Sequence, residues 1–391
     1  MDLPEPTLVT RALRQGISND TQHGAVVPPW YPSTNFAFPV IGEEPDYAYS
    51  RSGNPTRDLF GQALATLEKG AGTVITSSGM SAATLAIMAF VPAAGRVVAA
   101  HDLYGGTWRL LDRLGADGKL QVDWVDLSDP DAARAALSTP ADLVWVETPS
   151  NPLLRITDIA AVAELGHAAG AVVLADNTFC SPLLQQPLTL GADVVLHSTT
   201  KFINGHSDVI GGALVAGTDE LAEQLDWWAN TTGVAGSSFD AWLQLRGLRT
   251  LDVRLRMHEA NARAVVALLV DHPAVARVHY PGLPDHPGHD IATRQQHGFG
   301  SLVSFDLAGG RAAADAMCHG LDWFVLAESL GGVESLIVHP SSMTHGAMSD
   351  DAKQLAGIGE GLLRLSIGIE QTSDLVADLT AGLDRAAATT V

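Results

Sequence analysis

Lys201 lies in the stretch Leu196–Asp208, LHSTTKFINGHSD, directly after an apolar run and beside several hydroxyl residues. A lysine at the end of a strand is ordinarily a solvated surface residue, and it needs no such neighbours. An amine that is partly shielded from water can instead act as a nucleophile or a base. The stretch therefore predicts that Lys201 takes part in chemistry, including the covalent attachment of a cofactor.

Binding of pyridoxal 5′-phosphate (PLP) requires four kinds of protein group: an amine for covalent attachment, an acid beside the pyridine nitrogen, an aromatic ring for stacking and hydrogen-bond donors for the phosphate. The chain offers a candidate for each. They are Lys201, then Asp176 at the end of VVLAD, Tyr104 in DLYGGT, and the turn SSGMSA with Gly79 and Met80, supplemented by the hydroxyls of Ser198 and Thr200.

Each of these features has an ordinary explanation when it stands alone. An aspartate at a strand end usually caps a turn, and SSGMSA is a normal start for a helix. The four features occur together in the chain order glycine turn, tyrosine, aspartate and lysine, and it is improbable that all four have independent ordinary explanations. PLP is therefore the expected cofactor.

The elements that would position these residues alternate between strand and helix. Short apolar runs such as GTVIT, RVVAA, DLVWVE, VVLAD and DVVLH are separated by helical segments. This alternation predicts a parallel sheet with helices on both faces, and ligands of such sheets bind beyond the carboxyl ends of the strands. Tyr104, Asn151, Asp176 and Lys201 all follow apolar runs, so we expect them at that edge.

The chain of 391 residues is too long for one hydrophobic core. Residues 1–53 are rich in proline, asparagine and aromatic residues, which predicts an extended arm. Residues 54–250 form the expected PLP-binding domain. Residues 251–391 form a smaller C-terminal α/β domain, with the strand candidates SLVSFDL, DWFVLAES and LLRLSIG; a single long helix is expected over 242–270.

Composition excludes several classes of protein. A net charge of −21 argues against a nucleic-acid surface, and two cysteines make no disulfide framework. The N-terminus lacks a secretory apolar segment, and no apolar run reaches the roughly 18 residues of a membrane span. A cytoplasmic protein is the expectation. The four histidines nearest the other motifs show no metal-binding spacing, so we expect no metal. They are His197, His206, His339 and His345.

The chain closely resembles the Cys/Met-metabolism family of fold-type-I PLP enzymes. The resemblance runs from about Thr10 to Leu383. It is carried by the blocks YSRSGNPT, SSGMSA, DLYGGT, ETPSNP, ADNTF, HSTTKFINGHSD, LAESLGG and LRLSIGIE.

The resemblance implies roles for particular residues. Lys201 is the attachment lysine and a catalytic base, Asp176 the partner of the pyridine nitrogen, and Tyr104 the stacking tyrosine with a second catalytic role if positive charge deprotonates its phenol. Gly79, Met80, Ser198 and Thr200 are implied to hold the phosphate. Arg364 is implied to bind the substrate α-carboxylate, supported by Asn151 and Ser329.

Assembly follows from the same resemblance. In the family, a tyrosine and an arginine of the YSR block reach the phosphate of a neighbouring subunit. Tyr49 and Arg51 match them. The implication is a homotetramer built from two dimers, with active sites shared across the dimer interface and no nucleic-acid or membrane partner.

Local features bear on the reaction. Gly106 stands where methionine γ-lyases carry a cysteine, and Glu328 matches an acid of members that handle cystathionine. Arg109 matches a basic residue near the distal part of the substrate. We therefore expect γ-replacement on an O-acylhomoserine, the O-succinyl or O-acetyl ester, with cysteine as nucleophile and cystathionine as product, in transsulfuration and methionine biosynthesis.

One departure keeps an alternative open. Ala48 stands before Tyr49, where these members usually carry an acid that would bind the incoming amino group. The alternative is γ-elimination, which cleaves cystathionine to cysteine, 2-oxobutanoate and ammonia. A non-enzymatic relative is disfavoured because both Lys201 and Asp176 are present.

Overall fold

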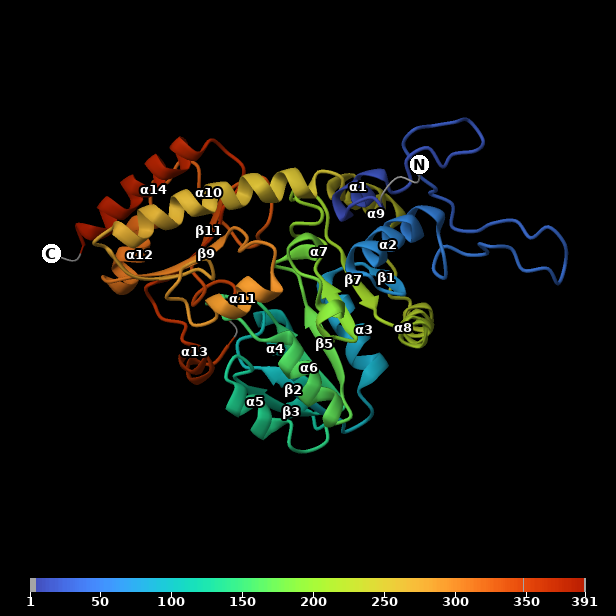
Figure 1. The fold of residues 1–391 in the computed structure, drawn as a ribbon, viewed down its shortest axis with the longest axis horizontal. Coiled ribbons are helices and arrows are strands. Elements are labelled where there is room, and N and C mark those ends of the chain that lie inside the picture. Colours follow the sequence, from blue (N-terminus) through green and yellow to red (C-terminus); the bar gives the residue numbers. More distant parts are fainter. Residues whose placement is uncertain (1–4, 347, 390–391) are drawn as a thin grey trace.

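A computed structural model describes residues 5–346 and 348–389 of the chain. Within these residues two β-sheets lie side by side, one of seven strands and one of five. The long helix α10 (Leu251–Asp271) runs along both of them, and the N-terminal segment projects away from the body (Figure 1). This arrangement confirms the predicted α/β class.

The larger sheet has the strand order β1-β7-β6-β5-β4-β2-β3. Only β7 runs antiparallel to its neighbours; the other pairs in this sheet are parallel. The strands are β1 (Gly72–Thr76), β2 (Arg96–Ala100), β3 (Gln121–Val125), β4 (Leu143–Glu147), β5 (Val172–Asp176), β6 (Val194–His197) and β7 (Gly212–Ala216).

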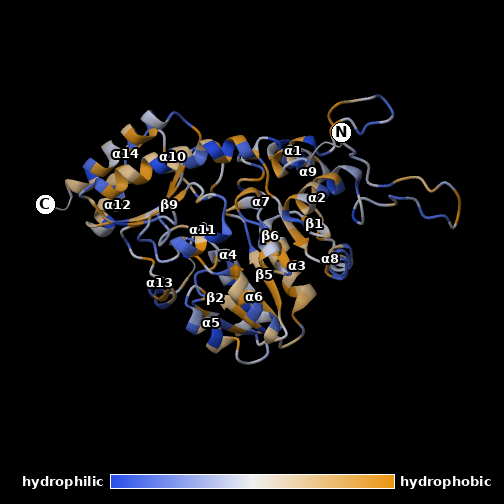
Figure 2. Ribbon diagram, viewed as in Figure 1, coloured by the Kyte–Doolittle hydropathy of each residue, from blue (hydrophilic) through white to orange (hydrophobic). Residues whose placement is uncertain are grey.

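Continuous apolar runs form these strands because both faces of the sheet are covered. In β6, Val194 packs into one core cluster while Val195 packs into another. Successive side chains of a strand point to opposite faces, so each face has its own core. Figure 2 shows hydrophobic colour concentrated on the strands of this sheet.

The helices around this sheet begin largely at capping side chains. Asn54 accepts the amides of Thr56 and Arg57, and Ser78 forms a capping box with Ser81. The helices are α1 (Leu8–Arg14), α2 (Pro55–Glu68), α3 (Gly79–Phe90), α4 (Gly105–Ala116), α5 (Pro130–Ala136), α6 (Ile159–Ala168), α7 (Ser181–Leu184), the 3-10 helix η1 (Pro187–Leu190), α8 (Asp219–Thr232) and α9 (Ser238–Leu248).

The smaller sheet has the order β10-β11-β12-β9-β8. Its strands are β8 (Val275–His279), β9 (Leu302–Leu307), β10 (Val325–Leu326), β11 (Leu336–Val338) and β12 (Leu362–Ser366). Helices α10, α12 (Gly310–Cys318) and α14 (Thr372–Ala387) share one core with it. Helices α11 (His289–Gln295) and α13 (Asp350–Ala356) complete this part. The division of the chain at residue 250 stays a prediction.

The expected single helix over 242–270 is wrong, because α9 ends at Leu248 and α10 begins at Leu251. The side chain of Arg254 explains the break. It donates to the carbonyl of Gly247 at 2.9 Å and to that of Phe202 at 2.8 Å. A guanidinium from the next helix thus joins the amide and the hydroxyl of Thr250 in donating to a carbonyl at the end of α9. It also fixes the turn that follows Lys201.

The expected strand DWFVLAES is shorter than predicted. Asp378 of α14 accepts the amides of Asp322, Trp323 and Phe324, so these groups do not pair with a strand. Only Val325–Leu326 joins the sheet.

The described part of the N-terminal segment consists mostly of turns and irregular chain, with one helix that was not expected. Helix α1 forms within it, and Ala12 is buried in a core cluster that α2 also joins. Among the described helices, none combines the length and apolar character that a membrane crossing requires.

Candidate active site

A cavity of about 800 Å³ opens at the carboxyl ends of β4, β5 and β6, where the two sheets meet. It brings together residues that are far apart in the sequence. Of the predicted site residues, those lining it are Gly79, Met80, Tyr104, Asn151, Asp176, Ser198, Thr200, Lys201, Glu328, Ser329 and Arg364. The cavity lies beyond the carboxyl ends of these parallel strands, where ligands of such sheets bind.

Lys201 sits in the turn after β6, and its Nζ donates to Ser329 Oγ at 2.8 Å. Burial, together with the positive charge of Arg364, lowers the pKa of Lys201 from 10.5 to about 8. A larger fraction of this amine is therefore neutral at physiological pH than for a surface lysine. His206 stabilises the same turn through Nδ1, which donates to the carbonyl of Asn204 at 2.7 Å when it carries the proton.

Two carboxyl groups end adjacent strands on the floor of the cavity. Asp176 ends β5 and accepts the amide of Thr178, and Glu147 lies beside it in the β4–β5 register. Burial raises the pKa of both, and the charge of Asp176 raises that of Glu147 further. Two buried acids with so few compensating partners create a site that favours a cation. A protonated pyridine nitrogen at Asp176 would supply that charge.

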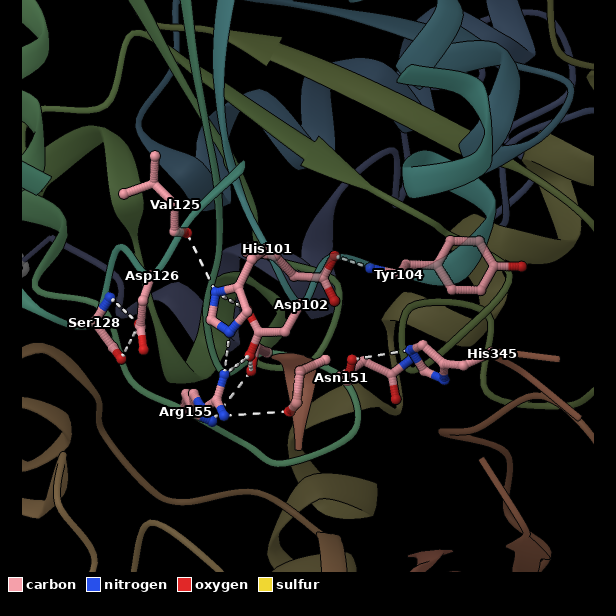
Figure 3. Close-up of polar contacts among 12 residues, drawn as sticks. His101, Asp102, Tyr104, Val125, Asp126, Ser128, Asn151, Arg155 and His345 are labelled. Carbon is pink, nitrogen blue, oxygen red and sulfur yellow. Dashed lines mark hydrogen bonds and ion pairs between the residues drawn. The ribbon is translucent and has the colours of Figure 1, made fainter. Parts of the chain in front are cut away.

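Tyr104 stands at the start of α4, and its backbone amide donates to Glu147 at 2.9 Å (Figure 3). Its ring lies against Gly106, where an added Cβ would come within 2.5 Å of the ring. Glycine at this position therefore leaves room for the tyrosine. Burial and the charge of Glu328 raise the pKa of Tyr104. The side chains of the protein therefore do not deprotonate the Tyr104 phenol, as nearby positive charge was expected to do.

The start of α3 provides a cradle for a phosphate. Gly79 faces Ser198 so closely that an added Cβ would lie 2.9 Å from the serine Cβ. Helix N-termini present free amides and a positive dipole end to anions. Thr200 reinforces the adjoining turn, since its hydroxyl donates to Gly211 O at 3.1 Å and accepts the amide of Gly211 at 3.0 Å.

Arg364 is the strongest anion-binding group of the cavity. It is only 2% exposed, and its guanidinium donates to Asn151 Oδ1 at 2.6 Å and to Ser329 O at 3.0 Å. Burial lowers its pKa to about 10, so it stays charged at neutral pH. Its Nε has no partner among the described residues. A buried guanidinium without a bound carboxylate fits a carboxylate ligand.

Two features of the backbone hold this arrangement in place. Ser329 has φ of 96°, a conformation that is costly for a residue with a side chain. It lets the serine offer its hydroxyl to Lys201 and its carbonyl to Arg364. His345 Nε2 donates to the carbonyl of Asn151 at 3.1 Å (Figure 3). Burial lowers the pKa of His345 to about 4, so it acts as a neutral donor.

Three predicted residues lie outside the cavity. Tyr49 is exposed, and Arg51 stacks over its ring and donates to Asn230 Oδ1 at 2.7 Å. Arg109 is exposed on α4, and its positive charge partly offsets the rise in the pKa of Tyr104. Sequence reasoning missed Glu147 and the positioning of Asn151 by His345. Glu147 stands in the block ETPSNP and His345 among the four histidines considered for a metal, but only their three-dimensional contacts reveal what they do.

Comparison with known proteins identifies the family to which the chain belongs. The family described as Cys/Met metabolism PLP-dependent enzyme matches residues 9–384. A cystathionine γ-synthase of Escherichia coli is 50% identical over 95% of this chain and 97% of its own. A cystathionine γ-lyase of Dictyostelium discoideum is 44% identical over 96% of this chain and 97% of its own.

A solved structure extends the comparison to three dimensions. The cystathionine γ-synthase of Xanthomonas oryzae pv. oryzae, in complex with aminoacrylate and cysteine, superposes with a TM-score of 0.97 and 56% identity. It covers 99% of this chain and 100% of its own.

Proposed function

The chain belongs to the Cys/Met metabolism PLP-dependent enzymes, and from this premise we propose that it joins an O-acylhomoserine to cysteine by γ-replacement, forming cystathionine. The family and the cofactor expected from the sequence are confirmed. The observation that carries the reaction is the likeness to the Xanthomonas oryzae cystathionine γ-synthase, which was solved in complex with aminoacrylate and cysteine. Such a reaction serves methionine biosynthesis.

Bound PLP supplies an electron sink that stabilises negative charge at the substrate α-carbon. The residues of the chain fit it: Lys201 as the attachment amine, Asp176 beside the ring nitrogen, Tyr104 over the ring, and the start of α3 at the phosphate. The two buried carboxyl groups and the positive dipole end of α3 favour such a group over an apolar ligand.

The protein's own groups then do the binding and the proton transfers. Arg364, held by Asn151, binds the α-carboxylate and orients the Cα–H bond. Lys201, with its pKa of about 8, takes the proton from Cα and then moves a proton at Cβ, so that the γ-substituent can leave. Ser329 holds the amine between these tasks through its hydroxyl.

Two side chains of opposite charge, Glu328 and Arg109, lie near the outer end of the cavity and can bind the distal charged groups of the substrates. Glu328 is exposed at the rim and can attract the ammonium group of cysteine. Arg109, nearby on α4, can bind the distal carboxylate of a succinyl ester. Ala48 removes the acid that would otherwise assist the incoming amino group, so relaxed choice of the nucleophile is expected.

The test compares substrates with one purified protein. The holoenzyme is incubated with O-succinylhomoserine with and without cysteine, with O-acetylhomoserine plus cysteine, and with cystathionine alone. Formation of cystathionine as the fastest reaction supports the proposal. Faster release of cysteine from cystathionine would instead establish the alternative, a cystathionine γ-lyase, which the departure at Ala48 and the 44% identical lyase relative favour.

The depressed pKa of Lys201 leads to a prediction about capture of the cofactor. Only a neutral amine attacks an aldehyde, so the rate of covalent PLP uptake by cofactor-free protein should be half-maximal near pH 8 and level off about one pH unit higher. For an ordinary lysine the half-maximal rate would be reached only at about pH 10.4. The measurement is the rate at which visible absorption grows after PLP is added. A profile still climbing above pH 9.5 would contradict the assignment.

We also propose that two chains share each active site. The arm that carries Tyr49 and Arg51 projects from the body, and several of its apolar side chains are exposed (Figure 1). They are Val26, Trp30, Phe38, Val40 and Ile41. Burial against a partner would remove this apolar surface from water. The complete assembly proposed is a homotetramer of 41.0 kDa chains.

Subunit mixing tests this arrangement. Arg51→Ala and Lys201→Ala chains should each be inactive, and co-refolding them should restore activity, because one site of each mixed dimer receives both intact residues. Random pairing predicts roughly a quarter of the parental activity. A mixture as inactive as its components would show that Arg51 serves its own chain's site.

A further inference from the structure

A second cavity, of about 270 Å³, lies on the side of the turn after β4 that faces β8. None of its lining residues lines the first cavity. Four of them carry or can carry positive charge, and none of the described lining residues is an acid. The lining consists of Ser128, Leu153, Arg155, Ile156, Arg277, His279, His286, Pro287, Gly288 and Ile291.

The two arginines differ in how they are held. Arg155 donates hydrogen bonds to Asp102 at 3.4 Å and to the carbonyl of Ala356 at 3.2 Å (Figure 3). These bonds hold its guanidinium in place, while 27% of its side chain remains exposed. The side chain of Arg277, which lies in β8 opposite Asp306, is exposed and has no hydrogen-bond or ion-pair partner among the described residues. One guanidinium is therefore preorganised at the wall, and the other is free to close over a ligand.

The two histidines add donors. His286 Nδ1 accepts the amide of Gly288 at 3.1 Å, so the neutral ring carries its proton on Nε2, which has no partner among the described residues. Burial, followed by the charges of His279 and Arg277, lowers the pKa of His286 to about 4. His279 is paired with Asp306 at 2.8 Å. The cavity is thus a locally positive region in a chain of net charge −21.

We propose that this cavity binds a small dianion, a dicarboxylate or a phosphate, held by Arg155, Arg277 and Nε2–H of His286. Planar guanidinium groups match the geometry of carboxylate and phosphate oxygens. Leu153, Ile156 and Ile291 give the cavity an apolar wall that would suit the short carbon chain of a dicarboxylate. The site is separate from the proposed reaction and stands independently of it.

The experiment uses isothermal titration calorimetry on the PLP-loaded protein. Succinate and inorganic phosphate are the probes that separate the two sources, and succinamide is the uncharged control. The variant Arg277→Gln removes a side chain without structural partners, so the fold should be unaffected. Arg134→Gln, on the exposed surface of α5, removes the same charge away from the cavity. A second variant, His286→Gln, removes the ring donor.

The proposal expects saturable binding of at least one dianion and none of succinamide. Affinity should fall about tenfold in Arg277→Gln and in His286→Gln and stay unchanged in Arg134→Gln. The preference between succinate and phosphate then identifies the source of the ligand. Absence of binding by both probes, or binding that Arg277→Gln leaves unaltered, would overturn the site; the second result would place the anion at Arg364 instead.

Discussion

A Lys201→Ala protein is expected to lose turnover by at least about 10³-fold and to lose its covalent cofactor. The amine at this position is the attachment point and the base, and no other lysine lines the cavity among the described residues. The measurements are the rate of cystathionine formation and the visible absorption of the purified protein. Mass spectrometry after borohydride reduction should find the cofactor on Lys201 in the parent and nowhere in the variant.

Lys119→Ala is the matched control, because that lysine is exposed and pairs only with the surface residue Asp117. It should retain both colour and activity. Turnover of Lys201→Ala at a rate near the parent's, or a reduced adduct at another lysine, would refute the assignment of the site and the mechanism drawn from it.

Replacing Arg364 with alanine is expected to lower kcat/KM by about 10²–10³-fold, because it removes a buried charge from a buried carboxylate site. The loss should appear mainly in KM for the amino-acid substrate. Steady-state kinetics with O-succinylhomoserine or cystathionine measure it. Visible absorption should remain, since this residue is assigned to the substrate and not to the cofactor.

Arg364→Lys separates charge from geometry. It retains the positive charge but cannot donate to Asn151 Oδ1, Ser329 O and a carboxylate in the same plane, so an intermediate loss is expected. Thermal unfolding of both variants checks that the cavity is intact. Equal KM values for the parent and Arg364→Ala would show that the carboxylate binds elsewhere.

The sequence alone was sufficient for the architecture near the cofactor. Continuous apolar runs, without alternation of polar residues, indicated the strands of a parallel sheet buried on both faces. The polar residues that follow these runs lie at the carboxyl edge of the sheet because parallel strands share that edge. Lys201, Asp176 and the start of α3 could be found this way, since each is defined by its neighbours along the chain. Tyr104 was a candidate for the same reason, and the family motifs added Arg364 and the substrate class.

Other properties depend on contacts between distant segments. Arg364 and Asn151 are joined by a hydrogen bond across 213 positions, and Lys201 and Ser329 across 128. Burial raises the pKa of Glu147 and of Asp176, and because β4 and β5 are neighbours the charge of Asp176 raises the pKa of Glu147 further, which no local pattern states. The break between α9 and α10 depends likewise on Arg254 meeting Gly247 and Phe202.

The motifs and periodicity of the sequence thus predicted which residues do chemistry and which elements carry them, because helix and strand periodicity are local properties. Strand order, the antiparallel β7, and the charge state of each group in the cavity were decided only by tertiary packing. Burial and charge pairing shift a pKa through the surroundings of a group in space, and those surroundings are assembled from residues scattered over the whole sequence.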